Sequence, residues 1–156
     1  MRTFAWALLV VVGSDMLPPL LLAGDSGGRA QYVGGTVAGL LSKSEGNINT
    51  TDEEVLLFRT KQATVRVTYG KINTIEHGQR VSRRVVEAIL ISPLLLLAKK
   101  RKHFLTVGYT DAQGHQQALV FQVDKSAVRS VLVSLEAKTG RKIEFQDEEA
   151  RKAGKG

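Results

Sequence analysis

The sequence predicts a mainly β domain of about six antiparallel strands followed by one amphipathic helix. Apolar and polar residues alternate in 64–69 and in two later runs, which is the period of a strand with one face in water. Near residue 125 the period changes, and apolar residues recur at helical spacing. The chain has 156 residues, of which 43% are apolar, so it fits one globular domain and excludes two full ones.

Residues 32–41 are predicted to form the first strand, and the turn-rich residues 42–49 a loop after it. Gly34 and Gly35 interrupt this apolar, β-branched run. Because no helical pattern follows them, a bulge or a bend in the strand is favoured over a phosphate-binding loop.

The next segment poses a choice between helix and strand. Thr51 and Glu54 have the spacing of a helix capping box. The alternation that follows them favours strands instead. We therefore predict two strands, near 54–60 and 63–69, and a further short strand over 72–79.

The last third of the chain predicts a hairpin, a helix and a charged tail. Two β-rich runs, 103–110 and 116–123, flank the turn sequence Asp-Ala-Gln-Gly. A helix is predicted over 125–139, with Asp124 or Ser126 as its cap and Gly140 as its stop. The residues after it predict a short strand and then, in the charged tail 145–156, a frayed helix or disorder.

Residues 1–30 are predicted to be a secretory signal peptide, which leaves 31–144 as the domain. Arg2 precedes an apolar middle, and small residues up to Ala30 offer a cleavage site before Gln31. Neither apolar half approaches the ~20 residues of a membrane-spanning helix. An uncleaved anchor and a translation start at Met16 are the alternatives. The expected location is the periplasm or the outside of the cell, including a peripheral position on the membrane surface.

One short segment carries nearly all of the net charge of +7. Residues 31–79 sum to zero, and residues 103–156 to +1. Residues 80–102 hold seven cations against Glu87 alone, which gives +6. Between the two basic groups lies the apolar run 85–98, which as a helix would reach ~21 Å, less than the ~30 Å of a hydrocarbon core.

Three interpretations of the segment 80–103 remain open. The run 85–98 is a buried element closing the sheet, an apolar wedge whose flanking cations dock on anionic lipid, or a contact patch for a protein. Nucleic-acid binding is less favoured, because the basic cluster has no aromatic residue for base stacking. The predicted electrostatic contacts are Arg80, Arg83, Arg84, Lys99, Lys100, Arg101, Lys102 and His103, and the predicted apolar contacts are Leu94, Leu95, Leu96 and Leu97.

The residues that carry chemistry do not form a recognisable catalytic or metal-binding pattern. The absence of cysteine excludes disulfides and thiolate sites. His77, His103 and His115 lie in different segments without metal-ligand spacing, so each is predicted to be a surface or strand-end histidine. With no nucleophile elbow and no phosphate-binding loop, we expect a non-catalytic protein without cofactor or metal.

The order of elements resembles the pleckstrin-homology-like (PH-like) superfold. Residues 99–106 leading into 108–111, then 118–123 and the helix ending at 140, are similar to uncharacterised bacterial proteins with a PH-like or GRAM-like domain. The resemblance covers 32–144. It implies an antiparallel β-barrel or sandwich of about six to seven strands closed by a C-terminal amphipathic helix. It also implies a binding or scaffolding module, with no catalytic residue to transfer.

Overall fold

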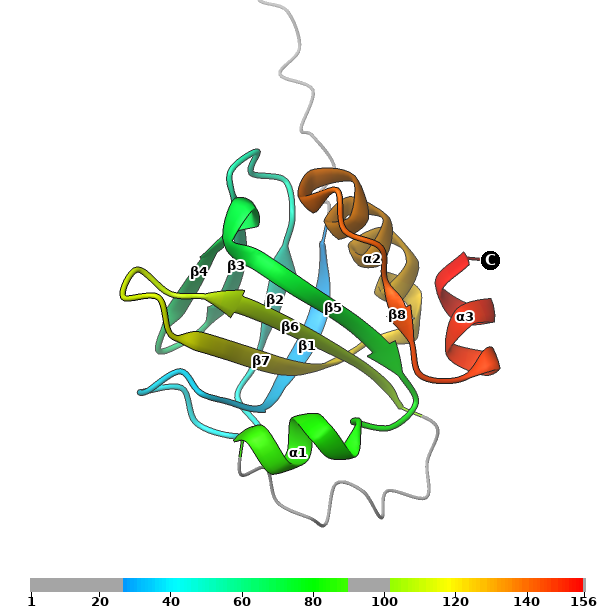
Figure 1. Cartoon of the computed structure of the whole chain (residues 1–156), viewed down its shortest axis with the longest axis horizontal. Coiled ribbons are helices and arrows are strands. Elements are labelled where there is room, and N and C mark those ends of the chain that lie inside the picture. The colour runs from blue at the N-terminus through cyan, green and yellow to red at the C-terminus, as the bar shows by residue number, and fades with distance from the viewer. Residues whose placement is uncertain (1–26, 90–101, 156) are drawn as a thin grey trace, which may run out of the picture.

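The computed structural model describes residues 27–89 and 102–155. The prediction of a mainly β domain with a C-terminal helix is confirmed, and within these residues eight strands form one sheet that does not close (Figure 1). Its strand order is β4-β3-β2-β1-β7-β6-β5-β8. The elements are β1 (Gly27–Gly35), β2 (Glu45–Asn49), β3 (Val55–Thr60), β4 (Thr64–Thr68), the 3-10 helix η1 (Tyr69–Lys71), β5 (Ile72–Gly78), α1 (Arg83–Ile89), β6 (His103–Thr110), β7 (Gln116–Val123), α2 (Lys125–Thr139), β8 (Glu144–Phe145) and α3 (Glu148–Lys155).

Two antiparallel meanders, β1 to β4 and β5 to β7, are joined by the antiparallel pairing of β1 with β7. The register of this pairing shifts between Tyr32 and Gly34, which is the bulge that the sequence predicts near the glycine pair. A side chain at Gly35 would collide with the carbonyl oxygen of Ala118. The glycine therefore allows the two strands to approach closely at the junction of the two meanders.

The main core lies between the inner face of the sheet and α2. Phe121 of β7 is its centre, with ring contacts to Phe58 at 4.8 Å and Tyr32 at 6.1 Å. The predicted bounds of α2 are confirmed, and Gly140 ends the helix with φ 66°. Asp124 occupies the N-cap position but makes no side-chain cap hydrogen bond. The core thus collects side chains from both meanders under one amphipathic helix.

The first part of the sheet corrects two predictions. The first strand is β1, which begins and ends earlier than the predicted 32–41, and the predicted loop 42–49 contains β2. β2 is mostly polar, but it pairs with β1 on one side and β3 on the other, and Ile48 is fully buried. Pairing on both sides overrides the weak strand propensity of this segment.

The predicted cleavage before Gln31 falls inside β1. Residues 27–30 pair with β2, and Ala30 belongs to the main core. The backbone N–H of Asp124 also donates to the Arg29 carbonyl at 3.1 Å, next to the start of α2. Cleavage at this point would remove pairing and core contacts from the domain.

The charged tail is docked on the domain. β8 pairs in parallel with β5 over two residues, and α3 follows it (Figure 1). Ala150 is fully buried, and Gly154 packs so closely against Phe145 and Leu132 that a side chain there would collide with both. The predicted short strand is confirmed, and of the two alternatives for the tail, a frayed helix or disorder, the structure has a helix, which packs on α2 and β5.

Leu135→Ala should reduce the free energy of unfolding by about 2–5 kcal/mol, because Leu135 is 0% exposed in the main core. Val133→Ala, on the same helix but 55% exposed, should change it by less than about 0.5 kcal/mol. Urea unfolding of both variants measures the difference. Equal effects would show that α2 does not pack on the sheet through the Leu135 face.

Candidate functional site

The outer face of the sheet carries a second, smaller apolar cluster on which α1 rests. Its buried members come from β1, β6, β7 and the loop before α1, and they are Val33, Phe104, Val120 and Val81. Val85 and Val86 of α1 pack against this cluster and are half-buried. The first part of the segment 80–103 is therefore anchored on the sheet by valines.

A buried carboxylate lies beside this cluster. Glu76 of β5 is only 4% exposed. Its carboxylate accepts hydrogen bonds from Ser82 Oγ at 3.1 Å, Arg84 Nη2 at 3.3 Å and Gln146 Nε2 at 3.0 Å. A buried charge is costly unless it is paired and hydrogen-bonded, so these three groups keep Glu76 in place. Together they connect β5 with α1 and with the residue that follows β8.

The predicted electrostatic contacts have different roles in the structure. Arg80 and Arg83 are exposed, whereas Arg84 is the partner of Glu76 with its own side chain 80% exposed. Lys102 and His103 are half-buried at the start of β6. The remaining predicted contacts lie outside the described residues: Lys99, Lys100, Arg101, Leu94, Leu95, Leu96 and Leu97.

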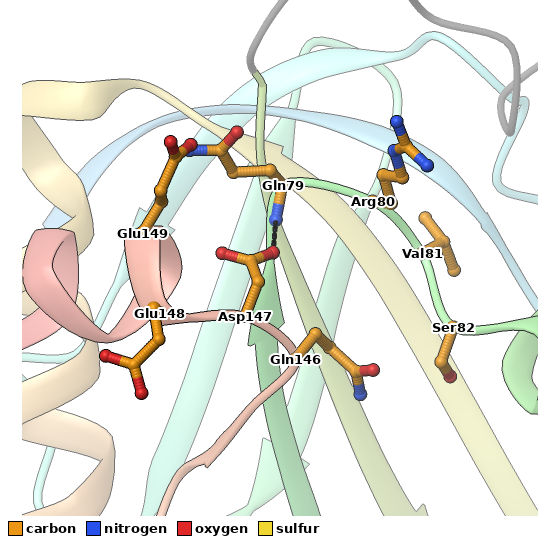
Figure 2. Close-up of a pocket in the computed structure, with 8 residues that line it drawn as sticks. All are labelled: Gln79, Arg80, Val81, Ser82, Gln146, Asp147, Glu148 and Glu149. Carbon is orange, nitrogen blue, oxygen red and sulfur yellow. Dashed lines mark hydrogen bonds between the residues drawn. The ribbon is translucent and has the colours of Figure 1, made fainter.

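An open pocket of about 570 Å³ lies where the loop before α1 meets the start of α3 (Figure 2). One wall is acidic, with Asp147, Glu148 and Glu149, and Asp147 accepts a hydrogen bond from the backbone N–H of Gln79 at 3.1 Å. Figure 2 shows the guanidinium of Arg80 turned away from these carboxylates. The acidic wall disfavours an anionic ligand inside this pocket. Arg80 is therefore available to an anionic group only on the side that faces away from the pocket.

The fold creates a second basic surface, which the net charges of the sequence segments did not predict. A groove of about 450 Å³ crosses β1, β2 and β3, and three exposed cations line it together with Glu45. Arg29 and Arg59 are opposite Asn47 on either side, which places their Cα atoms ~10 Å apart. Lys61 is the third cation. We call this surface the β1–β3 groove.

Strand alternation could have placed one cation of this groove, Arg59, on the outer face. The segment 31–79 sums to zero because its acids balance its cations. Three of those acids, Asp52, Glu53 and Glu54, lie in the turn between β2 and β3, where Lys138 of α2 pairs with Glu53 at 3.4 Å. Arg59 follows the buried Phe58, so it has the parity of the outer face.

Of the two predicted positions, surface or strand end, His77 has the second: it lies near the end of β5 and not at the surface. Its side chain is buried, 1% exposed, and its ring stacks on that of His103 with centroids 5.7 Å apart. Pairing of β5 with β6 brings the two residues together, because the register partner of His77 is Leu105, two residues after His103. His115 is exposed in the hairpin turn, as predicted.

No protein-family model matches the chain, and comparison with curated proteins gives no match. Among residues 27–89 and 102–155, no helix is long and apolar enough to cross a membrane. The same residues contain no group of three or more His, Asp or Glu placed to hold a metal ion. What these residues do offer is two exposed basic surfaces, one at α1 and one in the β1–β3 groove.

Arg84→Gln should lower the free energy of unfolding by about 1–2 kcal/mol, because it removes a charged donor from the buried Glu76. Arg83→Gln removes the same charge from the neighbouring position, where the side chain is exposed, and should cost less than about 0.5 kcal/mol. Thermal or urea unfolding of the matched pair checks this. A larger loss in Arg83→Gln would contradict the structural role of the Glu76 pair.

Proposed function

We propose that this protein is a non-catalytic binding module that docks on an anionic membrane surface through α1 and the basic residues around it. The observation that carries the proposal is the orientation of α1. Val81, Val85 and Val86 hold its apolar side on the sheet, and this leaves Arg80 and Arg83 exposed. A fixed helix with outward cations suits contact with a broad negative surface better than enclosure of a small ligand.

The charge of the segment 80–102 supports reversible binding. Each Lys or Arg close to an anionic leaflet contributes about 1 kcal/mol, and salt screens this attraction. Arg80, Arg83 and Lys102 are described in the structure, and the sequence places Lys99, Lys100 and Arg101 directly before Lys102. Binding is therefore expected to weaken steeply as ionic strength rises. An acidic protein surface is the alternative partner, and a purely structural domain with 85–98 as core is the alternative function.

We propose in addition that the domain is a bacterial PH-like barrel or sandwich. A four-stranded meander, a three-stranded meander and then the amphipathic α2 support this proposal, because they follow the order of elements on which the resemblance rests. A PH-like architecture supplies a scaffold for binding and does not by itself specify a ligand.

We propose that the protein is exported, with a leader that is removed before Gly27. Cleavage before Gln31 would take four residues out of β1 and remove Ala30 from the core. A signal that ends upstream leaves the whole strand intact. Export would place the basic surface on the periplasmic or extracellular side, where it meets a membrane face or a secreted partner.

The chain from Gly27 onward should sediment with vesicles that contain phosphatidylserine and not with phosphatidylcholine vesicles. The double variant Arg80→Glu with Arg83→Glu should bind at least about 30-fold more weakly, since two favourable contributions of ~1 kcal/mol each are lost. The matched double variant Arg59→Glu with Lys61→Glu tests the β1–β3 groove with the same change of charge. Its binding should stay close to that of the unmodified chain.

Other results of this assay have clear meanings. If only the β1–β3 groove variant loses binding, the groove is the contact surface and the assignment to α1 is wrong. Equal binding to both kinds of vesicle, or to neither, removes the membrane proposal and leaves an acidic protein partner and a purely structural domain as the alternatives. Binding that does not weaken with salt would contradict an electrostatic contact.

Mass determination of the protein from its native host, after cell fractionation, should find a mature amino terminus at or before Gly27 in the exported fraction. The physical reason is the pairing of residues 27–30 with β2. A mature chain that begins at Gln31 would show that these pairs are dispensable. An intact Met1 in the cytosol would remove export from the proposal.

A further inference from the structure

His77 and His103 form a stacked pair whose ring nitrogens are incompletely bonded. The rings are 5.7 Å apart and inclined by only 14°. His77 Nδ1 lies 2.9 Å from the carbonyl oxygen of Phe104, so the neutral ring donates its Nδ1 proton there and carries a lone pair on Nε2. Within the described residues, the buried His77 Nε2 and His103 Nδ1 have no hydrogen-bond partner. Such a pair is stable when both rings are neutral.

The C-terminal segment from β8 to α3, which we call the strap, covers His77 from one side. Phe145 of β8 places its ring edge-on to His77 at 6.2 Å. On another side, Val128, Val131 and Leu132 of α2 lie around His77 and leave no space for a water molecule. Apolar groups therefore surround the buried ring on the sides of α2 and β8.

Two charged groups affect pKa values in this pair, and His103 also affects the pKa of His77. Burial is the largest effect on His77 and lowers its pKa, and the hydrogen bond to the Phe104 carbonyl opposes it. The neighbouring His103 lowers the pKa of His77 further, while Asp147 before α3 raises it, and the net direction is down. Burial also lowers the pKa of His103, with Lys125 of α2 adding to the effect and Asp147 opposing it. Both rings therefore resist protonation in the closed structure.

The strap is attached to the edge of the sheet by few hydrogen bonds. The Gln146 N–H donates to the His77 carbonyl at 3.0 Å, and its side chain reaches Glu76 at 3.0 Å. Asp147 receives the Gln79 N–H at 3.1 Å. With only two residues paired in β8, the strap is expected to open more easily than the strands of the main core.

We propose that the His77–His103 pair makes the docking of the strap depend on pH, so that the strap is closed at neutral pH and opens on acidification. Opening exposes both rings to water, where a histidine takes up a proton near its ordinary pKa of ~6.5. The closed state resists that proton. The equilibrium constant for strap opening therefore does not change with pH above about pH 6.5. Below that pH it rises by up to ~10-fold per pH unit for each of the two rings that is neutral in the closed state.

Hydrogen exchange of the full chain at pH 7.5 and 5.5, corrected for the intrinsic exchange rate, measures strap opening at the amides of Gln146 and Gln79, which donate to the His77 carbonyl and to Asp147. Between these two pH values the opening constant should rise up to ~100-fold, that is ~10-fold for each histidine. His103→Gln keeps one histidine and should show a rise of ~10-fold. His115→Gln removes an exposed histidine of the hairpin turn and should behave like the unmodified protein.

Three outcomes would overturn this proposal. The first is a rise that is unchanged in His103→Gln and in His77→Gln. The second is faster exchange by the same factor in the strap and in the main core, which would show global unfolding. The third comes from NMR titration of the unmodified chain: if the rings of His77 and His103 gain protons near pH 6.5 while the strap stays protected, the pair does not control the strap. This titration needs no variant, so it applies even if His77→Gln does not fold.

Discussion

The pairing of β1 with β7 joins the four-stranded and three-stranded halves of the sheet. Across it, Phe121 of β7 meets Phe58 of β3 and Tyr32 of β1, so one aromatic group draws on both halves. α2 can cover a continuous apolar face only because this pairing exists. The partner strands are 89 positions apart at Tyr32 and Phe121, so the fold depends on a contact that forms at a high cost in loop-closure entropy.

The two faces of this sheet differ in how much apolar surface they offer to helices. The inner face is covered by α2. On the outer face the apolar cluster is small, and it is held by the short helix α1 with its valines. Polar and charged residues occupy the rest of that face, including Glu76 and the β1–β3 groove. Contacts with a partner are therefore expected on the outer side, where the core leaves side chains available.

Local sequence patterns predicted those strands and the helix whose conformation depends on the residues within the element itself. The β6–β7 hairpin and α2 follow from alternation, a turn sequence and a glycine stop, all within short stretches of chain. β2 could not be predicted in this way, because its residues become a strand only between β1 and β3. The same limit applies to His77, whose burial and stacking on His103 arise from the β5–β6 register across a gap of 26 residues. The β1–β3 groove was missed because counting charge along the chain mixes residues from both faces of each strand.

The buried Glu76 also changes the meaning of the charge on the segment 80–102. Arg84 belongs to that segment, but it neutralises a carboxylate on β5 that the segment count leaves out, so the charge of +6 is effectively reduced to +5. Arg80 lies beside the acidic wall formed by the start of α3. One cation thus fixes α1, and another is partly offset by its neighbours. In the docking that we propose, Arg83 and the cations that immediately precede β6 act together with Arg80, which contributes from the side facing away from the acidic wall. The link between Arg84 and Glu76 then helps to set the angle at which α1 would present Arg83 to an anionic surface.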